Sequence, residues 1–220
     1  MKLEDRSQEH TGYDYHVLVR DDVIPHVPRL GGALLDIGGG SGATAARLKL
    51  LGNAERVGVV DIVDCAGPEM DFSYVGSVED PTVIARVIAD EGPFETILCL
   101  DILEHLVDPW RLVGQLHSGL APGGVLVGSI PNIRNYNALV PLLFKNKWQL
   151  RDAGILDRTH LRFFVRSSAI ELMTCSGLEL RSVHPSPSGG RRVRLFRWMT
   201  FGLLNSFTDR QYIVCVQRVS

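Results

Sequence analysis

A glycine-rich segment, LLDIGGGSG at residues 34–42, is the strongest local sign of chemistry in this sequence. It follows a short apolar run and precedes a stretch rich in alanine and leucine, so it is expected to join a strand to a helix. Gly38, Gly40 and Gly42 satisfy the pattern GxGxG, and Ala43 completes the dinucleotide fingerprint GxGxx(G/A). Glycines at such a junction let the backbone turn tightly and approach a ligand closely. A plain turn in an α/β sheet is the alternative interpretation of the glycines alone.

Two carboxylates narrow the choice of ligand. Asp61 ends the next apolar run, where an acid that binds ribose hydroxyls belongs in a nucleotide-binding βαβ unit. Asp36 lies two residues before Gly38, where its charge would repel a pyrophosphate at close range. A ligand with an amino group and a sulfonium but no phosphate would be attracted instead. The pair therefore favours S-adenosylmethionine over NAD. The alternative is that a buried Asp36 only braces the loop through backbone hydrogen bonds.

Histidines and arginines supply candidates for the chemical step. Transfer of a group to an acceptor needs alignment and desolvation, and also a base where the nucleophile is a hydroxyl. His105 lies in DILEHL, directly after the apolar run TILCL. The segment RDAGILDRTHLRFF, residues 151–164, carries His160 as a candidate base, and Arg158 and Arg162 as candidates for gripping an anionic group. The alternatives are an ordinary polar residue near a helix start for His105 and a salt-bridged lid that only excludes water for the segment.

Apolar runs and helix signals predict the elements that must position these groups. Asp80 and Asp108 are each followed by proline, as an N-cap residue often is. Ser168 and Glu171 form an S-x-x-E capping box, while Pro141 is expected to break a short helix over NALVPLLF. Strands are expected at 33–37, 56–61, 72–75, 96–100, 125–130, 178–183 and 212–219, and helices at 41–51, 81–92, 109–120 and 168–175.

The alternation of these elements predicts an α/β fold. We expect a Rossmann-like seven-stranded, mostly parallel sheet with helices on both faces and an antiparallel final strand. Residues 1–220 are expected to form a single domain. Its parts are an N-terminal cap segment at 1–30 that carries Tyr13, Tyr15 and Arg20, an acceptor-side insertion at 131–166, and a basic and aromatic connection at 184–211.

The composition is that of an ordinary globular protein. The chain has 220 residues, 45% hydrophobic and 22% charged, with a net charge of -2. These figures exclude collagen-like, disordered and disulfide-scaffold classes, and they argue against a bulk nucleic-acid binder. The four cysteines lie far apart, and the polar N-terminus lacks the apolar stretch of a signal peptide. No segment approaches the roughly 20 apolar residues that span a bilayer. We expect a cytoplasmic protein that binds no nucleic acid.

Five motifs, in order and at family spacing, resemble those of the class I S-adenosylmethionine-dependent methyltransferases. They are LLDIGGGSG, VGVVD, GSVED, FETILCLDILEHLVDP and LAPGGVLVGSIPN. The resemblance extends from about Tyr13 to Val219. Within that class, DILEHL is similar to ubiquinone-type O-methyltransferases, and GILDRTHLRFF to methyltransferases associated with bacterial surface glycans. The sequence departs from the family at Gly39, where cysteine is common, and at Ser77, where an acid usually binds the adenine amino group.

The resemblance implies S-adenosylmethionine as the cofactor. It also implies a role for each residue that matches a motif. Asp36, Gly38 and Gly40 would hold the methionine part, Asp61 the ribose, and Ile62, Ser77 and Val78 the adenine, while Leu100 and Asp101 would face the methyl-bearing sulfur. Asp101 joins His105 and His160 as a catalytic candidate.

The sequence leaves two further questions undecided, a possible metal site and the role of residues 191–204. Asp101, Glu104 and His105 match the D/E-x-x-E-H pattern of ubiquinone-type O-methyltransferases, some of which are thought to bind a divalent metal there. Carboxylates suit a hard cation such as Mg²⁺, although we do not favour a metal. RRVRLFRWMTFGLL, residues 191–204, mixes arginines with aromatic residues. It is interpreted as a peripheral membrane contact, a homodimer interface, or a solvated face with a packed underside.

The leading hypothesis is a methyltransferase that acts on a hydroxyl of a small molecule or glycan. The sequence leaves both the acceptor and the choice between oxygen and nitrogen open. An NAD-binding oxidoreductase or epimerase is one alternative, which Asp36 and the lack of a YxxxK pair after the fifth strand disfavour. A non-catalytic S-adenosylmethionine-binding module is the other. The polar groups in DILEHL and 151–164 disfavour it, because an inactive site need not keep them.

Overall fold

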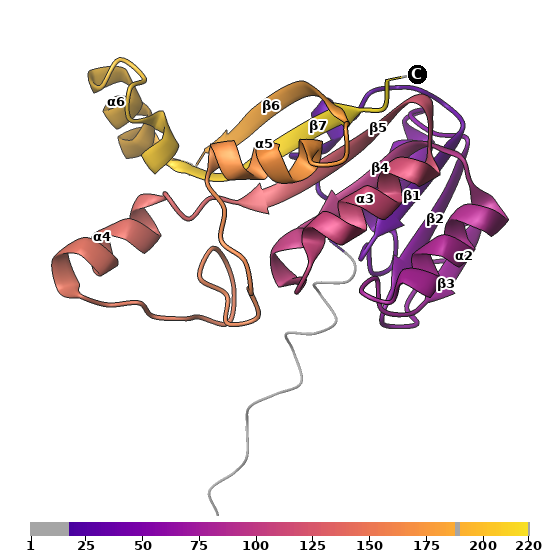
Figure 1. The fold of residues 1–220 in the computed structure, drawn as a ribbon. Helices are drawn as coiled ribbons and strands as arrows, with labels where there is room; N and C mark the ends of the chain where they lie inside the picture. Colours follow the sequence, from indigo (N-terminus) through magenta and orange to yellow (C-terminus); the bar gives the residue numbers. More distant parts are fainter. Residues whose placement is uncertain (1–17, 188–189, 220) are drawn as a thin grey trace, which may run out of the picture.

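The computed structural model describes residues 18–187 and 190–219, and Tyr13 and Tyr15 of the predicted cap segment lie outside this range. One sheet has the strand order β3-β2-β1-β4-β5-β7-β6 (Figure 1). Its strands are β1 Ala33–Ile37, β2 Arg56–Asp61, β3 Phe72–Val75, β4 Phe94–Leu100, β5 Leu120–Pro131, β6 Glu179–Pro187 and β7 Asp209–Gln217.

The helices connect the strands and extend from them. They are α1 Ala43–Leu50, α2 Pro81–Glu91, α3 Pro109–Gly119, α4 Tyr136–Lys145, α5 Arg166–Thr174 and α6 Arg191–Met199. Short 3-10 helices occur at η2 Ile24–His26, η3 Leu103–His105 and η4 Asn205–Phe207. As predicted, α2 and α3 begin with an aspartate N-cap and a proline, and the side chains of Asp80 and Asp108 accept backbone N–H bonds at the two starts.

The predicted fold class is confirmed. β1 pairs in parallel with β2 and β4, and β2–β3 and β4–β5 are also parallel. Only β7 runs the other way, antiparallel to both β5 and β6. All five residues of β1 are buried, which is the pattern of a central strand covered on both faces.

Helices pack on both faces of the sheet. One core combines inward side chains of the sheet with residues of α2, α3 and α5, such as Ile84, Leu112 and Leu172. Figure 1 shows these three helices together on one face. The core on the other face includes Leu48 of α1 and Val23, which precedes η2. Because parallel strands end at one edge, the segments after β1, β2 and β4 meet there, and this edge carries the candidate site.

Pro141 does not break α4, and that prediction is wrong. The helix runs through Pro141 to Lys145, and its first turn is capped by Asn135, whose side chain accepts the N–H of Asn137. A proline inside a helix removes one backbone donor and leaves the carbonyl four residues earlier without its partner. Here that carbonyl belongs to exposed Asn137, so water can satisfy it.

The predicted capping box at Ser168 is also wrong. α5 begins two residues earlier, at Arg166, so Ser168 occupies the third helical position rather than the N-cap. Its Oγ accepts the N–H of Val165 at 3.0 Å and donates to the carbonyl of Val165 at 3.1 Å. The hydroxyl therefore reaches back to the helix start, as a polar residue at this position often does.

Candidate active site

The loop between β1 and α1 has the tight backbone that its glycines predict. Gly38, Gly40 and Gly42 all have positive φ, at 68°, 58° and 77°. Gly39 matters for a different reason, because a Cβ there would lie 2.4 Å from the carboxyl carbon of Asp36. The loop therefore wraps closely around the Asp36 side chain.

Asp61 braces this loop from the end of β2. Its Oδ2 accepts the N–H of Gly40 at 2.8 Å, and its Oδ1 accepts the N–H of Val63 at 3.0 Å. Each carboxylate oxygen can accept more than one hydrogen bond, so these contacts leave room for ligand hydroxyls. The predicted ribose-binding residue thus also holds the glycine loop in place.

Asp36 is buried, and one of its carboxylate oxygens lacks a hydrogen-bond partner among the described residues. The residue is 2% exposed, and its Oδ1 has no hydrogen-bond partner in the described part of the chain. Burial, together with the charge of Asp61, raises the pKa of Asp36 from 3.8 to about 7. Burying a carboxylate oxygen without a partner costs folding free energy, so a cationic ligand group in the loop would be attracted to it. The alternative that Asp36 only braces the loop leaves Oδ1 unexplained.

The other predicted cofactor residues lie around the same edge. Ile62, directly after Asp61, is 71% exposed and offers an apolar surface on which a flat ring can pack. Val78 is buried, and Ser77 Oγ accepts the N–H of Glu79 at 3.2 Å. Leu100 ends β4 and packs against the core on the α1 face. Their contacts with a cofactor stay predictions.

Asp101 follows β4 in a left-handed conformation, with φ of 52°. Ser129 Oγ donates to its Oδ1 at 2.8 Å, and an Arg20 guanidinium N–H donates to its Oδ2. Burial raises the pKa of Asp101, against the opposing effect of the Arg20 charge. Ser129 is a site residue that sequence reasoning missed. Its signal was a hydroxyl in the otherwise apolar strand VLVGSI.

Arg20 connects the segment before β1 to three other parts of the chain. Its backbone N–H donates to Thr44 Oγ1 of α1 at 3.1 Å. Its side chain donates to Asp22 as well as to Asp101, and Gln211 of β7 donates to Asp22 at 2.9 Å. The described part of the predicted cap segment is therefore fixed across the edge of the sheet that carries the candidate site.

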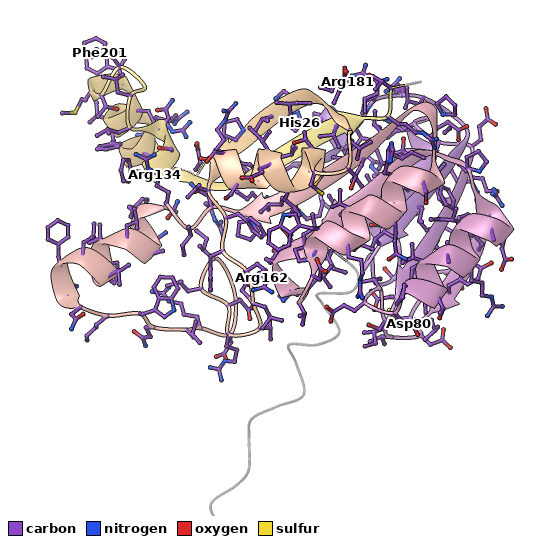
Figure 2. The ribbon with its side chains drawn as sticks, in the orientation of Figure 1. His26, Asp80, Arg134, Arg162, Arg181 and Phe201 are labelled. Carbon is purple, nitrogen blue, oxygen red and sulfur yellow. The ribbon has the colours of Figure 1, made fainter. Side chains whose placement is uncertain are left out.

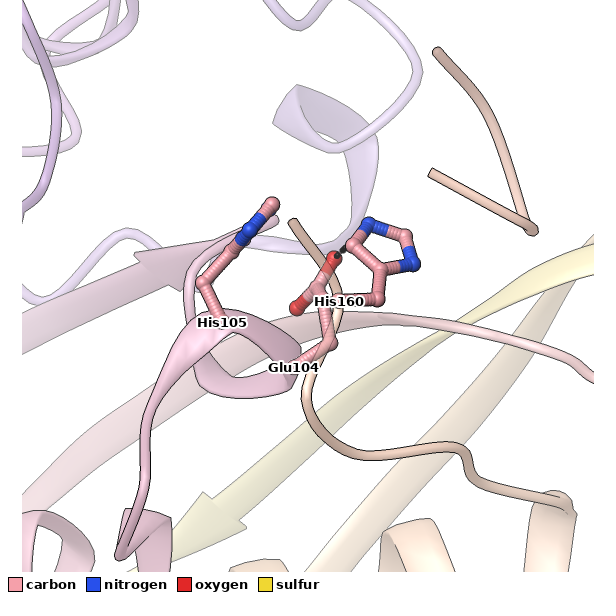
Figure 3. A group of neighbouring side chains, drawn as sticks. All are labelled: Glu104, His105 and His160. Carbon is pink, nitrogen blue, oxygen red and sulfur yellow. Dashed lines mark ion pairs between the residues drawn. The ribbon is translucent and has the colours of Figure 1, made fainter. Parts of the chain in front are cut away.

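A second buried carboxylate lies beside two histidines. Glu104 and His105 of η3 and His160 of the 151–164 segment point toward one another (Figure 3). Glu104 is 1% exposed, and neither carboxylate oxygen has a hydrogen-bond partner among the described residues. Its Oε1 lies 3.9 Å from Nε2 of His160, and the His105 and His160 rings meet edge to face with centroids 4.6 Å apart.

Backbone contacts set the orientation of His160. The N–H groups of Leu161 and Arg162 donate to the carbonyl of Glu104 at 2.8 and 3.0 Å, which holds the segment against η3. Nδ1 of His160 lies 3.1 Å from the carbonyl oxygen of Ile155, and since a carbonyl only accepts, Nδ1 carries the proton. In the neutral ring Nε2 then has the free electron pair and faces Glu104.

Burial shapes the protonation of this pair. It lowers the pKa of His160, with the neighbouring His105 acting in the same direction. It raises the pKa of Glu104 from 4.5 to about 8, with help from the charge of Asp101. A neutral imidazole next to a carboxyl group that resists ionisation is an arrangement suited to accepting a proton.

The same cluster is the set of described residues that could hold a metal. Glu104, His105 and His160 each offer a ligand atom, and these atoms lie within 4.8 Å of one another. The set differs from the predicted one, because Asp101 bonds to Arg20 and Ser129 while His160 enters from another loop. Two imidazoles and one carboxylate suit Zn²⁺, Mn²⁺ or Fe²⁺ better than Mg²⁺.

The two arginines predicted to bind an anionic acceptor have protein partners. Arg158 pairs with Asp152 at 2.7 Å on the surface, and Arg162 donates to the carbonyl of Val107. A cavity of about 440 Å³ lies between α4 and the 151–156 segment and is lined instead by Arg151 and Arg210. These contacts do not test the acceptor-binding prediction, but they add two arginines that it did not include.

Comparison with known proteins bears on this geometry. A family described as "Methyltransferase domain" matches residues 16–183. The chain is 29% identical over 158 residues to a ubiquinone biosynthesis O-methyltransferase of Azotobacter vinelandii, and the match covers 66% of this chain and 63% of that protein. It is 24% identical over 212 residues to the Xylella fastidiosa protein of the same name, covering 89% and 77%. The chain thus spans less than two thirds of the length of the Azotobacter protein.

A solved structure shares the fold. A SAM-dependent methyltransferase from Archaeoglobus fulgidus superposes with a TM-score of 0.61 over 90% of both chains, at 16% sequence identity. The chain therefore shares the fold of this protein over most of its length.

Proposed function

The chain belongs to the methyltransferase-domain family, and on that premise we propose that it methylates a hydroxyl oxygen of a small-molecule or glycan acceptor with S-adenosylmethionine. The observation that carries the proposal is the pair formed by His160 and Glu104. A neutral imidazole whose unprotonated Nε2 lies 3.9 Å from the Glu104 carboxyl group provides the base that a hydroxyl nucleophile requires and that an already neutral amine does not.

The described residues fit the cofactor. Its amino group is the cation that the unpaired Oδ1 of Asp36 requires, and its ribose hydroxyls suit the remaining acceptor capacity of Asp61. Ile62 offers the apolar surface for the adenine. When bound, the cofactor supplies a methyl group activated by the sulfonium.

His160 and Glu104 then act on the acceptor. With the cofactor bound, Nε2 of His160 would take the proton of the acceptor hydroxyl as that oxygen displaces S-adenosylhomocysteine. The carbon–sulfur bond would break as the carbon–oxygen bond forms, and the ring would become an imidazolium. The carboxyl group of Glu104, 3.9 Å away, stabilises this charge when it is ionised. Asp101, which accepts hydrogen bonds from Arg20 and Ser129, is held at the same edge of the sheet and adds a negative charge there when it is ionised.

The structure and the family match both disfavour the NAD-dependent alternative. The buried carboxylate of Asp36 inside the glycine loop opposes a pyrophosphate, and the family match gives no support to an NAD-dependent oxidoreductase or epimerase.

An activity assay distinguishes the enzyme from a non-catalytic binding module. The purified chain is incubated with S-adenosylmethionine and a panel of phenols, sugar derivatives and amines, and S-adenosylhomocysteine release is measured. A product heavier by one methylene unit among the hydroxyl acceptors supports the proposal, methylation of amines alone contradicts it, and cofactor binding without any turnover indicates the module.

Metal removal distinguishes a base from a metal ligand at His160. Thorough dialysis against EDTA is expected to leave turnover unchanged, because Nε2 serves as the base. Added Zn²⁺ is expected to inhibit, because a metal bound by Glu104, His105 and His160 takes the same electron pair. Turnover that disappears with EDTA and returns with Zn²⁺ or Mn²⁺ would show instead that the cluster is a catalytic metal site.

A further inference from the structure

Two helices carry exposed apolar side chains beyond the sheet. α4 and the turn after it expose Phe144 and Trp148, at 79% and 44%. α6 and the turn after it expose Trp198, Phe201 and Leu203, at 76%, 92% and 85%. Both helices project from the same side of the sheet in Figure 1, and Figure 2 shows Phe201 at the outer end of this projection. Exposed apolar side chains such as these mark surfaces that another phase or molecule covers.

The two helices are tied together where they leave the sheet. The side-chain amides of Asn132 and Asn135 both donate to the carbonyl of Asp209, at 3.0 and 2.9 Å. The Arg134 guanidinium lies over the ring of Phe207, 4.6 Å from its centroid. The start of α4 and the turn that leads from α6 into β7 are therefore joined in one hydrogen-bonded unit.

Arg197 fixes the orientation of α6. Its guanidinium donates to the carboxylate of Asp209, and its Nε donates to Thr208 Oγ1 at 2.7 Å. These bonds hold one side of α6 against the start of β7. Trp198 and Phe201 then remain in solvent.

The charge of this region has a single sign. Neither residues 133–151 nor residues 190–208 contain an aspartate or a glutamate, although the whole chain has a net charge of -2. Arg191 and Arg194 of α6 and Lys145 at the end of α4 are exposed. Both segments thus present apolar and basic side chains without a carboxylate of their own, and Asp209 at the junction is buried and paired with Arg197.

We infer that α4 and α6 together dock on the surface of an anionic phospholipid bilayer. Exposed tryptophan, phenylalanine and leucine side chains enter the boundary between headgroups and acyl chains, while neighbouring lysines and arginines bind anionic headgroups. No helix in the described ranges has the length and apolarity to cross a bilayer, so this contact is made from one side.

The charge pattern argues against a second copy as the occupant. In a two-fold dimer the same patch meets itself, so Arg191, Arg194 and Lys145 of one protomer would face the same cations of the other. An anionic lipid surface is complementary to this patch, whereas a second copy repels it.

The sheet topology orients the docked molecule. α4 follows the end of β5 and α6 follows the end of β6, and these strands run in the same direction because both are antiparallel to β7. Asp101 follows β4, which is parallel to β5. Docking through the two helices therefore brings the catalytic edge toward the lipid surface. This inference concerns the location of the chain and stands without the proposed hydroxyl acceptor.

Vesicle sedimentation tests the inference. The full chain is mixed with phosphatidylcholine vesicles that contain either no anionic lipid or roughly 30% phosphatidylglycerol. Binding is expected to require phosphatidylglycerol and to fall when NaCl is raised from about 0.1 M to about 0.5 M. The double variants Arg191→Gln/Arg194→Gln and Trp198→Ser/Phe201→Ser are each expected to weaken binding about tenfold or more.

Matched substitutions on α1 serve as controls. Arg47→Gln and Leu50→Ser change an exposed arginine and a leucine that is 76% exposed, and both are expected to bind vesicles like the unaltered chain. Circular dichroism checks that every variant is folded. Equal sedimentation with and without vesicles would overturn the inference, and so would a dimer in analytical ultracentrifugation that Trp198→Ser/Phe201→Ser dissociates.

Discussion

Replacing Asp36 with asparagine is expected to weaken S-adenosylmethionine binding about 100-fold, which corresponds to roughly 2.7 kcal/mol. The asparagine side chain has nearly the same shape but no charge for the amino group of the cofactor. Removing one partner of a buried charge pair costs about 2–5 kcal/mol, so the expected loss lies at the lower end of that range. Isothermal titration calorimetry measures it directly.

The same substitution is expected to stabilise the free protein above neutral pH. The pKa of Asp36 is raised from 3.8 to about 7, so between these values the folded state holds a proton that the unfolded state has released. Stability therefore falls as pH rises through this window, and asparagine, which cannot ionise, escapes that loss. Urea unfolding at pH 8 is expected to show a gain of at least about 1 kcal/mol, since one pKa unit is worth about 1.4 kcal/mol.

Two controls accompany this prediction. Asp90→Asn changes a carboxylate at the end of α2, 46% exposed, and is expected to leave affinity unchanged. With the unaltered protein at pH 6.5, cofactor binding is expected to release protons, because the cationic ligand favours the ionised form of Asp36. Titration in two buffers of different ionisation heat detects this release. If Asp36→Asn binds the cofactor as tightly as the unaltered protein, Asp36 only braces the loop.

Replacing His160 is expected to reduce turnover strongly while cofactor affinity stays the same. His160→Ala is expected to lower kcat at least tenfold, and about 100-fold where no other base replaces it. His160→Asn sharpens the experiment, because its side-chain amide can still donate to the carbonyl of Ile155 but offers no basic nitrogen. Both variants are expected to bind S-adenosylmethionine normally, because His160 interacts with Glu104 and His105 of η3 and with Ile155 of its own segment.

His105 and His117 complete the comparison. His117 lies in the last turn of α3, away from the cluster, so His117→Asn is expected to turn over normally. His105 faces Thr159 through its Nδ1 and touches the ring of His160, so it is the competing candidate for the base. Near-full activity of His160→Asn together with loss of activity in His105→Ala would transfer the role to His105.

Most of the fold could be predicted because its central strands and helix starts have strong local signals. ALLDI and TILCL are buried on both faces, so apolar residues dominate both runs and do not alternate with exposed polar ones. The exact ends of the strands were harder to predict. β4 begins at Phe94, two residues before the predicted start. The prediction missed these residues because a charged side chain such as Glu95 is more typical of a loop. Its carboxylate instead accepts the N–H of Ala33 at 2.6 Å. β5 likewise begins at Leu120, before the predicted start at residue 125.

The site was predictable where its residues are close in sequence, and not where they come together only in the fold. Asp36 and Asp61 follow from the glycine loop and the end of the next strand. Spacing also grouped Asp101 with Glu104, but the positive φ of Asp101 and its bond to Arg20 direct its carboxylate elsewhere. His160 meets Glu104 because backbone bonds hold its loop against η3, and no local pattern encodes those contacts.

The position of β7 has a consequence for the order in which the protein can be made. β7 follows all the other described strands and helices in the chain, yet it lies between β5 and β6 in the sheet. While the ribosome has not yet released β7, β5 lacks a neighbour on one side, and β6 has no strand beside it. The carbonyl of Asp209 that Asn132 and Asn135 bind is missing at the same stage. The nascent chain can therefore assemble its cofactor loop early, whereas α4 and α6 take their places only once translation has passed β7.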